Sequence, residues 1–160
     1  MSRKSIVLFY SWAGHTRSMA EAIARLTGAE MQEIVPEKPY SSDYNTVVND
    51  AKKEIRQGYH PPIRPIERDL SQYDTIFLGT PIWWGTMAPP VATCLEGHDF
   101  SGKTILPFTT HGGGGKGHSD RDIAALCPGA KVTGMYTTYE GGGNALEGEL
   151  RTWLQQNGIR

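Results

Sequence analysis

Hydroxyl, glycine and cationic side chains follow directly on the first apolar run of the sequence. Residues 11–17 read SWAGHTR, so Ser11 and Thr16 offer hydroxyl groups, Gly14 permits close backbone approach and Arg17 carries a positive charge. A helical pattern begins here, and the unpaired N–H groups and dipole of a helix N-terminus attract anions. The segment therefore predicts a phosphate-binding loop. A helix cap and a turn would explain Ser11, Gly14 and Thr16 without any ligand, and the sequence leaves this alternative open.

Two adjacent tryptophans mark a second segment that could hold a ligand. Residues 80–90 read TPIWWGTMAPP and follow a dense apolar run that is typical of a buried strand. Indole rings in a surface connection leave apolar area exposed unless something flat covers them. Trp83 and Trp84, which stand between Pro81 and Gly85, therefore predict a platform for a planar ring. A contact with the core or with a second copy of the chain is the alternative.

A run of glycines marks a third segment. His111 is followed by four glycines at 112–115, and backbone N–H groups without side chains can approach a ligand closely. The segment predicts a backbone wall beside a ligand, with a merely flexible loop as the alternative. The run fails the G-x-x-x-x-G-K-[ST] motif of phosphate binding twice, because Thr110 replaces its first glycine and Gly117 its final hydroxyl residue.

Other kinds of site are not indicated. The sequence contains no G-x-S-x-G motif of a hydrolase, and its five histidines lack a consistent metal-ligand spacing. The residues therefore predict neither a catalytic side chain nor a metal site.

Alternating strand and helix patterns position these three segments. Strands are predicted at residues 6–10, 29–35, 74–79, 103–110 and 131–138. Helices are predicted at residues 16–27, 43–57, 119–127 and 144–157. This alternation is typical of a doubly wound α/β sandwich with a five-stranded parallel sheet. Ligands of such sheets bind beyond the carboxyl ends of the strands, so we expect the three segments to meet at one edge.

Single residues refine this expectation. Thr16 is the predicted N-cap of the first helix, and Gly28 ends that helix. Pro107 lies inside the fourth strand and has no N–H to donate, so a bulge or an early end of strand pairing is expected there.

The connection at about 36–73 is unusually long for a compact domain. It contains the helix at 43–57, with Val47, Val48, Ala51 and Ile55 on one side, and then the extended stretch YHPPIRPIE. Such an excursion is often a lid or an interface, and a homodimer built on it is left open. The whole chain, residues 1–160, is nevertheless expected to form one domain.

Composition excludes several classes of partner. The net charge is −1 and no Lys/Arg-rich block occurs, so neither nucleic acid nor an anionic membrane is an expected partner. No apolar stretch reaches the length of about 20 residues that a membrane span needs, and a cytoplasmic location is expected. Cys94 and Cys127 form no C-x-x-C pair, and we interpret them as buried, helix-associated thiols.

A phosphate loop, an indole platform and a glycine wall at one sheet edge describe a site for a phosphorylated planar ring, and flavin mononucleotide (FMN) fits it. The chain resembles the flavodoxin-like family over nearly its whole length. The segments that carry this resemblance are VLFYSWAGHTR, FLGTPIWWGTMAPP and FTTHGGGGKG. The resemblance implies the strand order 2-1-3-4-5, a phosphate held by the first segment, and a flavin ring stacked on Trp84, with Trp83 as the alternative. Ala13 replaces one of the family's usual hydroxyl residues, so one hydrogen bond to phosphate must come from the backbone or from Arg17. The cofactor-binding residues that it implies are Ser11, Trp12, Ala13, Gly14, His15, Thr16, Arg17, Pro81, Ile82, Trp83, Trp84, Gly85, Thr86, Thr110, His111, Gly112, Gly113, Gly114 and Gly115.

Three functional classes remain open for such a protein. The first is a redox protein that transfers electrons through its flavin to a partner protein. Dedicated carriers of this kind are usually strongly acidic, which this chain is not. The second class is therefore an NAD(P)H-dependent quinone reductase, with a nicotinamide cofactor and a small quinone-like acceptor, in which His111 or Tyr44 lines the substrate side. A flavin-binding regulatory module without turnover is the third class.

Overall fold

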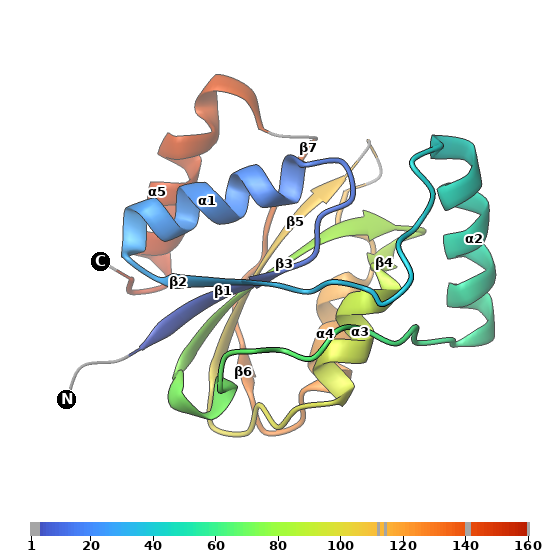
Figure 1. The fold of residues 1–160 in the computed structure, drawn as a ribbon. Helices are drawn as coiled ribbons and strands as arrows, with labels where there is room; N and C mark the ends of the chain where they lie inside the picture. The colour runs from blue at the N-terminus through green and yellow to red at the C-terminus, as the bar shows by residue number, and fades with distance from the viewer. Residues whose placement is uncertain (1–3, 112, 114, 140–141, 160) are drawn as a thin grey trace.

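A parallel β-sheet forms the centre of the computed structural model, which describes residues 4–111, 113, 115–139 and 142–159 (Figure 1). Its strands are β1 (Ser5–Phe9), β2 (Glu30–Glu33), β3 (Thr75–Trp83), β4 (Thr86–Met87), β5 (Thr104–His111), β6 (Lys131–Val132) and β7 (Tyr136–Tyr139). The order along the sheet is β2-β1-β3-β5-β6, β7 also pairs with β5, and β4 pairs with β3 in antiparallel fashion. The predicted order 2-1-3-4-5 is confirmed, with the fifth predicted strand divided into β6 and β7.

Pro107 accounts for this division. The pairing of β5 with β3 runs without a break through Leu78 and Pro107, so the expected interruption does not occur on that side. On the other side, Thr133 N–H donates to the Ile105 carbonyl oxygen at 2.9 Å. Alternate residues of a strand face the same neighbour, so Pro107 faces this side too and has no N–H to offer. Pairing resumes only at Phe108 and Tyr136.

Two helices cover each face of the sheet. The helices are α1 (His15–Thr27), α2 (Tyr44–Gln57), α3 (Pro89–Glu96), α4 (Ser119–Leu126) and α5 (Leu146–Gln156), with short 3₁₀ turns at Leu70–Gln72 and Gly143–Ala145. Met19, Ile23 and Leu150 of α1 and α5 bury one face, whereas Val91 and Ile123 of α3 and α4 belong to the core on the other face. Figure 1 shows this sandwich, and α2 lies outside both layers.

Two sequence-based predictions of element ends are wrong. Gly14, not Thr16, is the N-cap of α1, with φ of 96°, a left-handed conformation that glycine adopts readily. Thr16 lies inside the first turn, where it is buried. The third strand continues beyond residue 79 to Trp83, because residues 82 and 83 pair with β4 in a hairpin. The bounds of α3 were not predicted.

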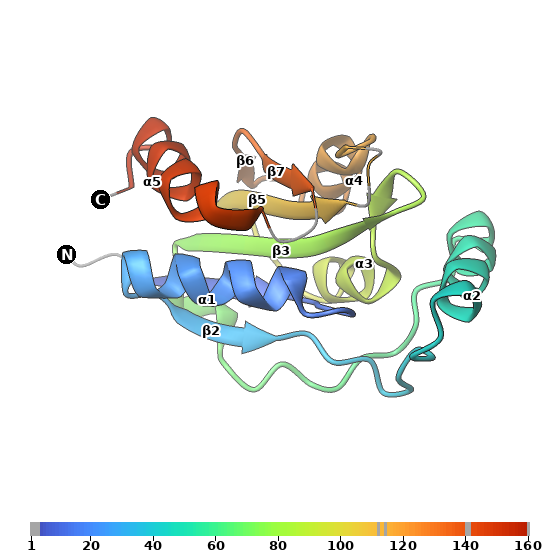
Figure 2. The same ribbon diagram turned by 90° about the horizontal axis from the view of Figure 1, so that it is seen from above.

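Helix α2 is an excursion from the sheet. Asp43 caps its start by accepting the Thr46 N–H at 3.0 Å, and Gly58 ends it. The chain returns in extended form, with Arg64 N–H donating to the Val35 carbonyl at 2.7 Å. Figure 2 shows α2 beyond the end of the molecule toward which β3 and β5 point, so the long connection at 36–73 positions a helix over the carboxyl edge of the sheet.

The two cysteines are free and buried, as predicted. Burial raises the pKa of the Cys94 thiol to about 12 and that of Cys127 to about 11, so both are protonated at neutral pH. Within the described ranges, no helix combines the length and the apolar character that a membrane crossing requires.

Candidate functional site

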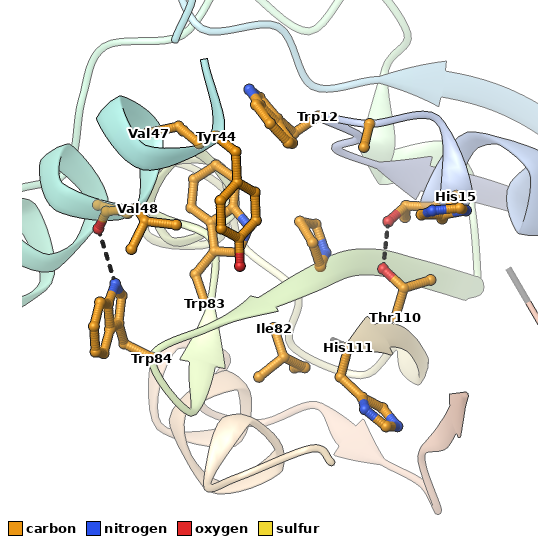
Figure 3. A pocket seen from close by; sticks show the side chains of 14 residues that line it. Trp12, His15, Tyr44, Val47, Val48, Ile82, Trp83, Trp84, Thr110 and His111 are labelled. Atoms are coloured by element: carbon orange, nitrogen blue, oxygen red, sulfur yellow. Dashed lines mark hydrogen bonds between the residues drawn. The ribbon is translucent and has the colours of Figure 1, made fainter. Parts of the chain in front are cut away.

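A cavity of about 480 Å³ lies at the carboxyl edge of the sheet, between α2, the segment that follows β1 and the carboxyl ends of β3 and β5 (Figure 3). It brings together Trp12, Ala13, His15, Thr16, Pro81, Ile82, Trp83, Trp84, Thr110 and His111 of the predicted set. All three predicted segments therefore contribute to one cavity. Ser11, Gly14, Arg17, Gly85, Thr86, Gly113 and Gly115 are described but do not line it. Gly112 and Gly114 lie outside the described residues.

The α1 end of the cavity is polar. The Thr16 and Thr110 hydroxyls lie 3.0 Å apart and join α1 to β5, as the dashed line in Figure 3 shows. The Ser11 hydroxyl accepts the Gly14 N–H at 3.1 Å and so shapes the turn before the helix. Because the helix leaves its first N–H groups without partners of its own, this end of the cavity can receive an anion.

Arg17 has a different partner from the predicted phosphate. Its guanidinium lies 2.6 Å from the Glu33 carboxylate of β2 and 5.4 Å from the centre of the Phe9 ring. The charge therefore sits beside the sheet edge formed by β2, and the backbone and the Thr16 and Thr110 hydroxyls are left to meet an anion in the cavity. The sequence could not reveal this ion pair, because Arg17 belongs to α1 and Glu33 to β2, and local patterns do not show how side chains of different elements meet.

The two indoles of the hairpin have different surroundings. Trp83 packs edge-on against Tyr40 and Tyr10, with ring centres 5.2 and 5.8 Å away. Burial is the main cause that raises the pKa of both tyrosines, so both stay neutral. Trp84 is half-exposed, and its Nε1–H donates to the Val48 carbonyl oxygen of α2 at 3.0 Å. Neither indole is sealed in the interior, and the stacking of Trp84 on a ring stays a prediction.

The hairpin turn itself is tightly held. Trp84 and Gly85 have φ of 55° and 80°, which is the two-residue type I′ geometry that normally favours Asn-Gly. His118 N–H donates to the Gly85 carbonyl at 2.8 Å. The Thr86 hydroxyl and the His118 ring both bond to the Asp122 carboxylate, so the start of α4 supports the turn from behind.

Helix α2 supplies the lining residues that sequence reasoning did not assign to the cofactor. They are Tyr44, Val47, Val48 and Ala51, of which Tyr44 was an expected substrate contact. The apolar spacing on this helix was visible in the sequence. The cavity that this apolar side faces was not visible, because the sequence does not show in which direction the connection at 36–73 leaves the sheet.

The chemistry of the cavity is that of an amphipathic, planar ligand. In the part of the chain that the structure describes, no Asp, Glu, Lys or Arg side chain lines it. Hydroxyls, His15 and the α1 N-terminus occupy one end, and aromatic and aliphatic side chains occupy the α2 end. No three His, Cys, Asp or Glu side chains of the described residues gather as ligands for a metal ion.

Curated relatives are quinone dehydrogenases. The chain is 37% identical over 99 residues to an NAD(P)H dehydrogenase (quinone) of Caulobacter vibrioides (strain NA1000 / CB15N), a match that covers 58% of this chain and 45% of the relative. It is 29% identical over 158 residues to NAD(P)H dehydrogenase (quinone) 3 of Rhizobium meliloti (strain 1021), covering 86% and 69% of the two chains. The chain thus spans about half the length of the first of these relatives.

Solved structures share the fold over nearly the entire chain. A crystal structure from Bacteroides eggerthii DSM 20697 matches with a TM-score of 0.85 at 28% identity, covering 99% of this chain and 100% of that one. The flavoprotein in complex with FMN from Lactobacillus acidophilus NCFM matches with a TM-score of 0.74 at 25% identity, covering 95% and 99%. The sequence model of the Flavodoxin family matches residues 4–157. On this match, and on the strand order that the structure confirms, the chain belongs to the flavodoxin family.

Proposed function

We propose that the cavity binds FMN and that the protein transfers electrons through this flavin. The observation that carries the proposal is the division of the cavity, with a helix N-terminus and a hydroxyl pair at one end and an uncharged aromatic and aliphatic wall at the other. A ligand that joins a phosphate to a flat ring needs the polar end for its phosphate and the apolar end for its ring. Membership of the flavodoxin family and the FMN complex of the Lactobacillus acidophilus relative support the same choice.

The residues of this chain fit the two parts of FMN. The N–H groups at the start of α1, with the Thr16 and Thr110 hydroxyls, would hold the phosphate, while Ile82, Trp84 and His111 would flank the ring. When bound, the flavin supplies the reversible electron and hydride chemistry, and the protein supplies binding, orientation and exclusion of water.

Titration with FMN and with riboflavin tests the proposal. We expect the purified protein to bind FMN and to bind riboflavin about tenfold or more weakly, because riboflavin leaves the α1 end without an anion, a loss of roughly 1–2 kcal/mol. The change in flavin absorbance and the quenching of its fluorescence measure both affinities. Equal affinities would contradict the phosphate assignment, and no binding of either flavin would contradict the proposed function.

The Arg17→Ala variant distinguishes two roles of Arg17, the ion pair with Glu33 that the structure shows and the phosphate contact that the sequence predicts. Because the guanidinium pairs with Glu33 and does not line the cavity, we expect a small loss of affinity that is the same for FMN and riboflavin. The same pair of titrations measures it. A loss confined to FMN would show that Arg17 leaves Glu33 and reaches the phosphate, as the sequence suggested.

An NAD(P)H-dependent quinone reductase is the second candidate function. The names of the curated relatives favour it, and so does the net charge of −1, which lacks the acidity that steers a dedicated carrier to its partner. Steady oxidation of NADH or NADPH in the presence of a quinone, without an added reductase, distinguishes this enzyme from a carrier that needs a redox partner protein. We also infer a cytoplasmic location, which agrees with two free thiols.

A further inference from the structure

We propose that helix α2 selects the molecule that exchanges electrons with the cofactor, through Tyr44 and Val48, and that Trp84 is the positioning residue that holds the helix in place. The selected molecule is an uncharged planar acceptor of the quinone class. This inference rests on the proposed function.

The apolar face of α2 borders the cavity. Val47 and Ala51 are 3% and 1% exposed, yet neither belongs to the core cluster on either face of the sheet. Both line the cavity together with Tyr44 and Val48. The chain itself covers Val47 and Ala51, since α2 contacts β3 and α3, so Tyr44, which is exposed, and Val48, which is half-buried, are the α2 residues left to contact an occupant.

Specific polar contacts fix α2 in this position. Two indole N–H groups from the site segments reach backbone oxygens of the excursion, from Trp12 to Ser41 at 2.9 Å and from Trp84 to Val48 at 3.0 Å. The Lys52 ammonium lies over the Trp84 ring, 5.0 Å from its centre. Figure 3 shows the Trp84 contact on the α2 side of the cavity.

The backbone at Trp84 supports a positioning role. Among the described residues, Trp84 is the only non-glycine residue with a positive φ, and it occupies a turn position that Asn, Asp or Gly would fill with less strain. The strained conformation aims the indole at α2. The contact with Val48 and Lys52 offsets the cost and couples the turn to the helix.

The lining determines which acceptor fits. Tyr44 is 68% exposed, and Figure 3 shows its ring directed into the cavity across from His111 and Thr110. The α2 end offers aromatic and aliphatic contacts, and no Lys, Arg, Asp or Glu lines any of the described cavity wall. A charged acceptor would lose hydration there without gaining a counter-charge, whereas a neutral flat ring would gain contact area.

Reoxidation of the reduced FMN-loaded protein tests this selection without depending on NAD(P)H. The protein is reduced with dithionite and mixed in a stopped-flow instrument with 1,4-benzoquinone or with ferricyanide. The quinone takes two electrons and two protons and becomes hydroquinone, and the flavin returns to its oxidised form. Ferricyanide takes one electron per ion, so two ions are consumed, and this anion does not depend on apolar contact.

We expect Tyr44→Ala and Val48→Asn each to lower the second-order rate constant for benzoquinone by about five- to tenfold, the order expected for the loss of one important contact. The ferricyanide rate constant should stay unchanged when each variant is saturated with FMN. Tyr59→Ala is the matched control, because Tyr59 is also exposed, at 48%, but lies outside this cavity. It should change neither rate.

Trp84→Phe tests the positioning role in the absence of cofactor. This variant keeps an aromatic ring and loses the N–H that reaches Val48. We expect faster hydrogen exchange of the α2 amides in the apoprotein, together with a lower benzoquinone rate in the FMN-loaded form. Unchanged exchange would overturn the role of Trp84.

The failures of the two proposals are distinguishable. Unchanged benzoquinone rates in the Tyr44 and Val48 variants, with FMN bound, would overturn selection by α2 and leave the flavin function intact. An equal fall for benzoquinone and ferricyanide would also overturn it, because the effect would then lie in the cofactor. Failure of the wild-type protein to bind FMN would overturn the proposed function itself.

Discussion

Gly117→Ala is expected to weaken FMN binding by about tenfold or more, because overpacking costs roughly 1–3 kcal/mol and a tenfold change corresponds to 1.4 kcal/mol. A Cβ atom at Gly117 would lie 2.2 Å from the Gly85 carbonyl oxygen and 2.5 Å from its Cα. Both atoms are backbone, so neither can swing away. The glycine-rich segment and the hairpin turn would have to separate, and the turn carries Trp84 of the cavity wall.

Gly102→Ala is the matched control for this variant. Gly102 has φ of 78°, close in kind to the 57° of Gly117, but a Cβ there meets nothing within 4 Å. Gly102 lies in the connection between α3 and β5 and does not line the cavity. Both variants carry the strain of alanine in a left-handed conformation, so the difference between their FMN affinities isolates the close approach. Equal affinities would contradict the role of this contact.

Gly79→Ala is expected to lower the free energy of unfolding by about 1–3 kcal/mol, and more if the neighbours cannot move. Gly79 lies in the middle of β3, where the Phe108 ring of β5 covers it. A Cβ would lie 2.3 Å from Cζ of Phe108 and 3.0 Å from the Phe9 Cβ. Phe108 and Phe9 are buried in the α1–α5 side of the core, so the ring has no free space to enter. Urea denaturation followed by circular dichroism measures the loss.

Gly148→Ala provides the opposite outcome for comparison. Gly148 lies inside α5, and a Cβ there meets nothing within 4 Å. Gly148 lies in the first turn, and alanine is favoured over glycine by up to about 0.8–1 kcal/mol in a helix interior, so this variant should be slightly more stable than the wild type. A Gly79→Ala protein as stable as the wild type would show that the Phe108 ring can relocate without cost.

Local patterns were sufficient to predict most of the elements and their order. The apolar runs at β1, β3 and β5 and the helical spacing of α1, α2 and α5 depend on residues close in sequence, and the structure contains all of them. The rule that ligands bind beyond the carboxyl ends of parallel strands then placed three segments at one cavity. Thr16 and Thr110, which are 94 residues apart, are within hydrogen-bond distance for this reason.

Contacts between distant side chains could not be predicted in the same way. The ion pair of Arg17 depends on the register of β2 against β1, and the bond from Trp84 to Val48 depends on where the excursion directs α2. Trp83 ends β3 and packs on Tyr10 and Tyr40, whereas Trp84 lies in the turn and reaches the helix. Residue type gave no sign of either outcome.

The break that Pro107 imposes has a consequence for association between chains. Exposed strand edges invite other chains to add a strand, and proteins resist this with short or blocked edges. At one border of the sheet, the outer strand is cut into the short pieces β6 and β7. At the other border, the Arg68 side chain donates to the Met31 carbonyl oxygen of β2 at 3.1 Å and occupies an acceptor that an incoming strand would need. Both features hinder the addition of a strand from another chain at these borders.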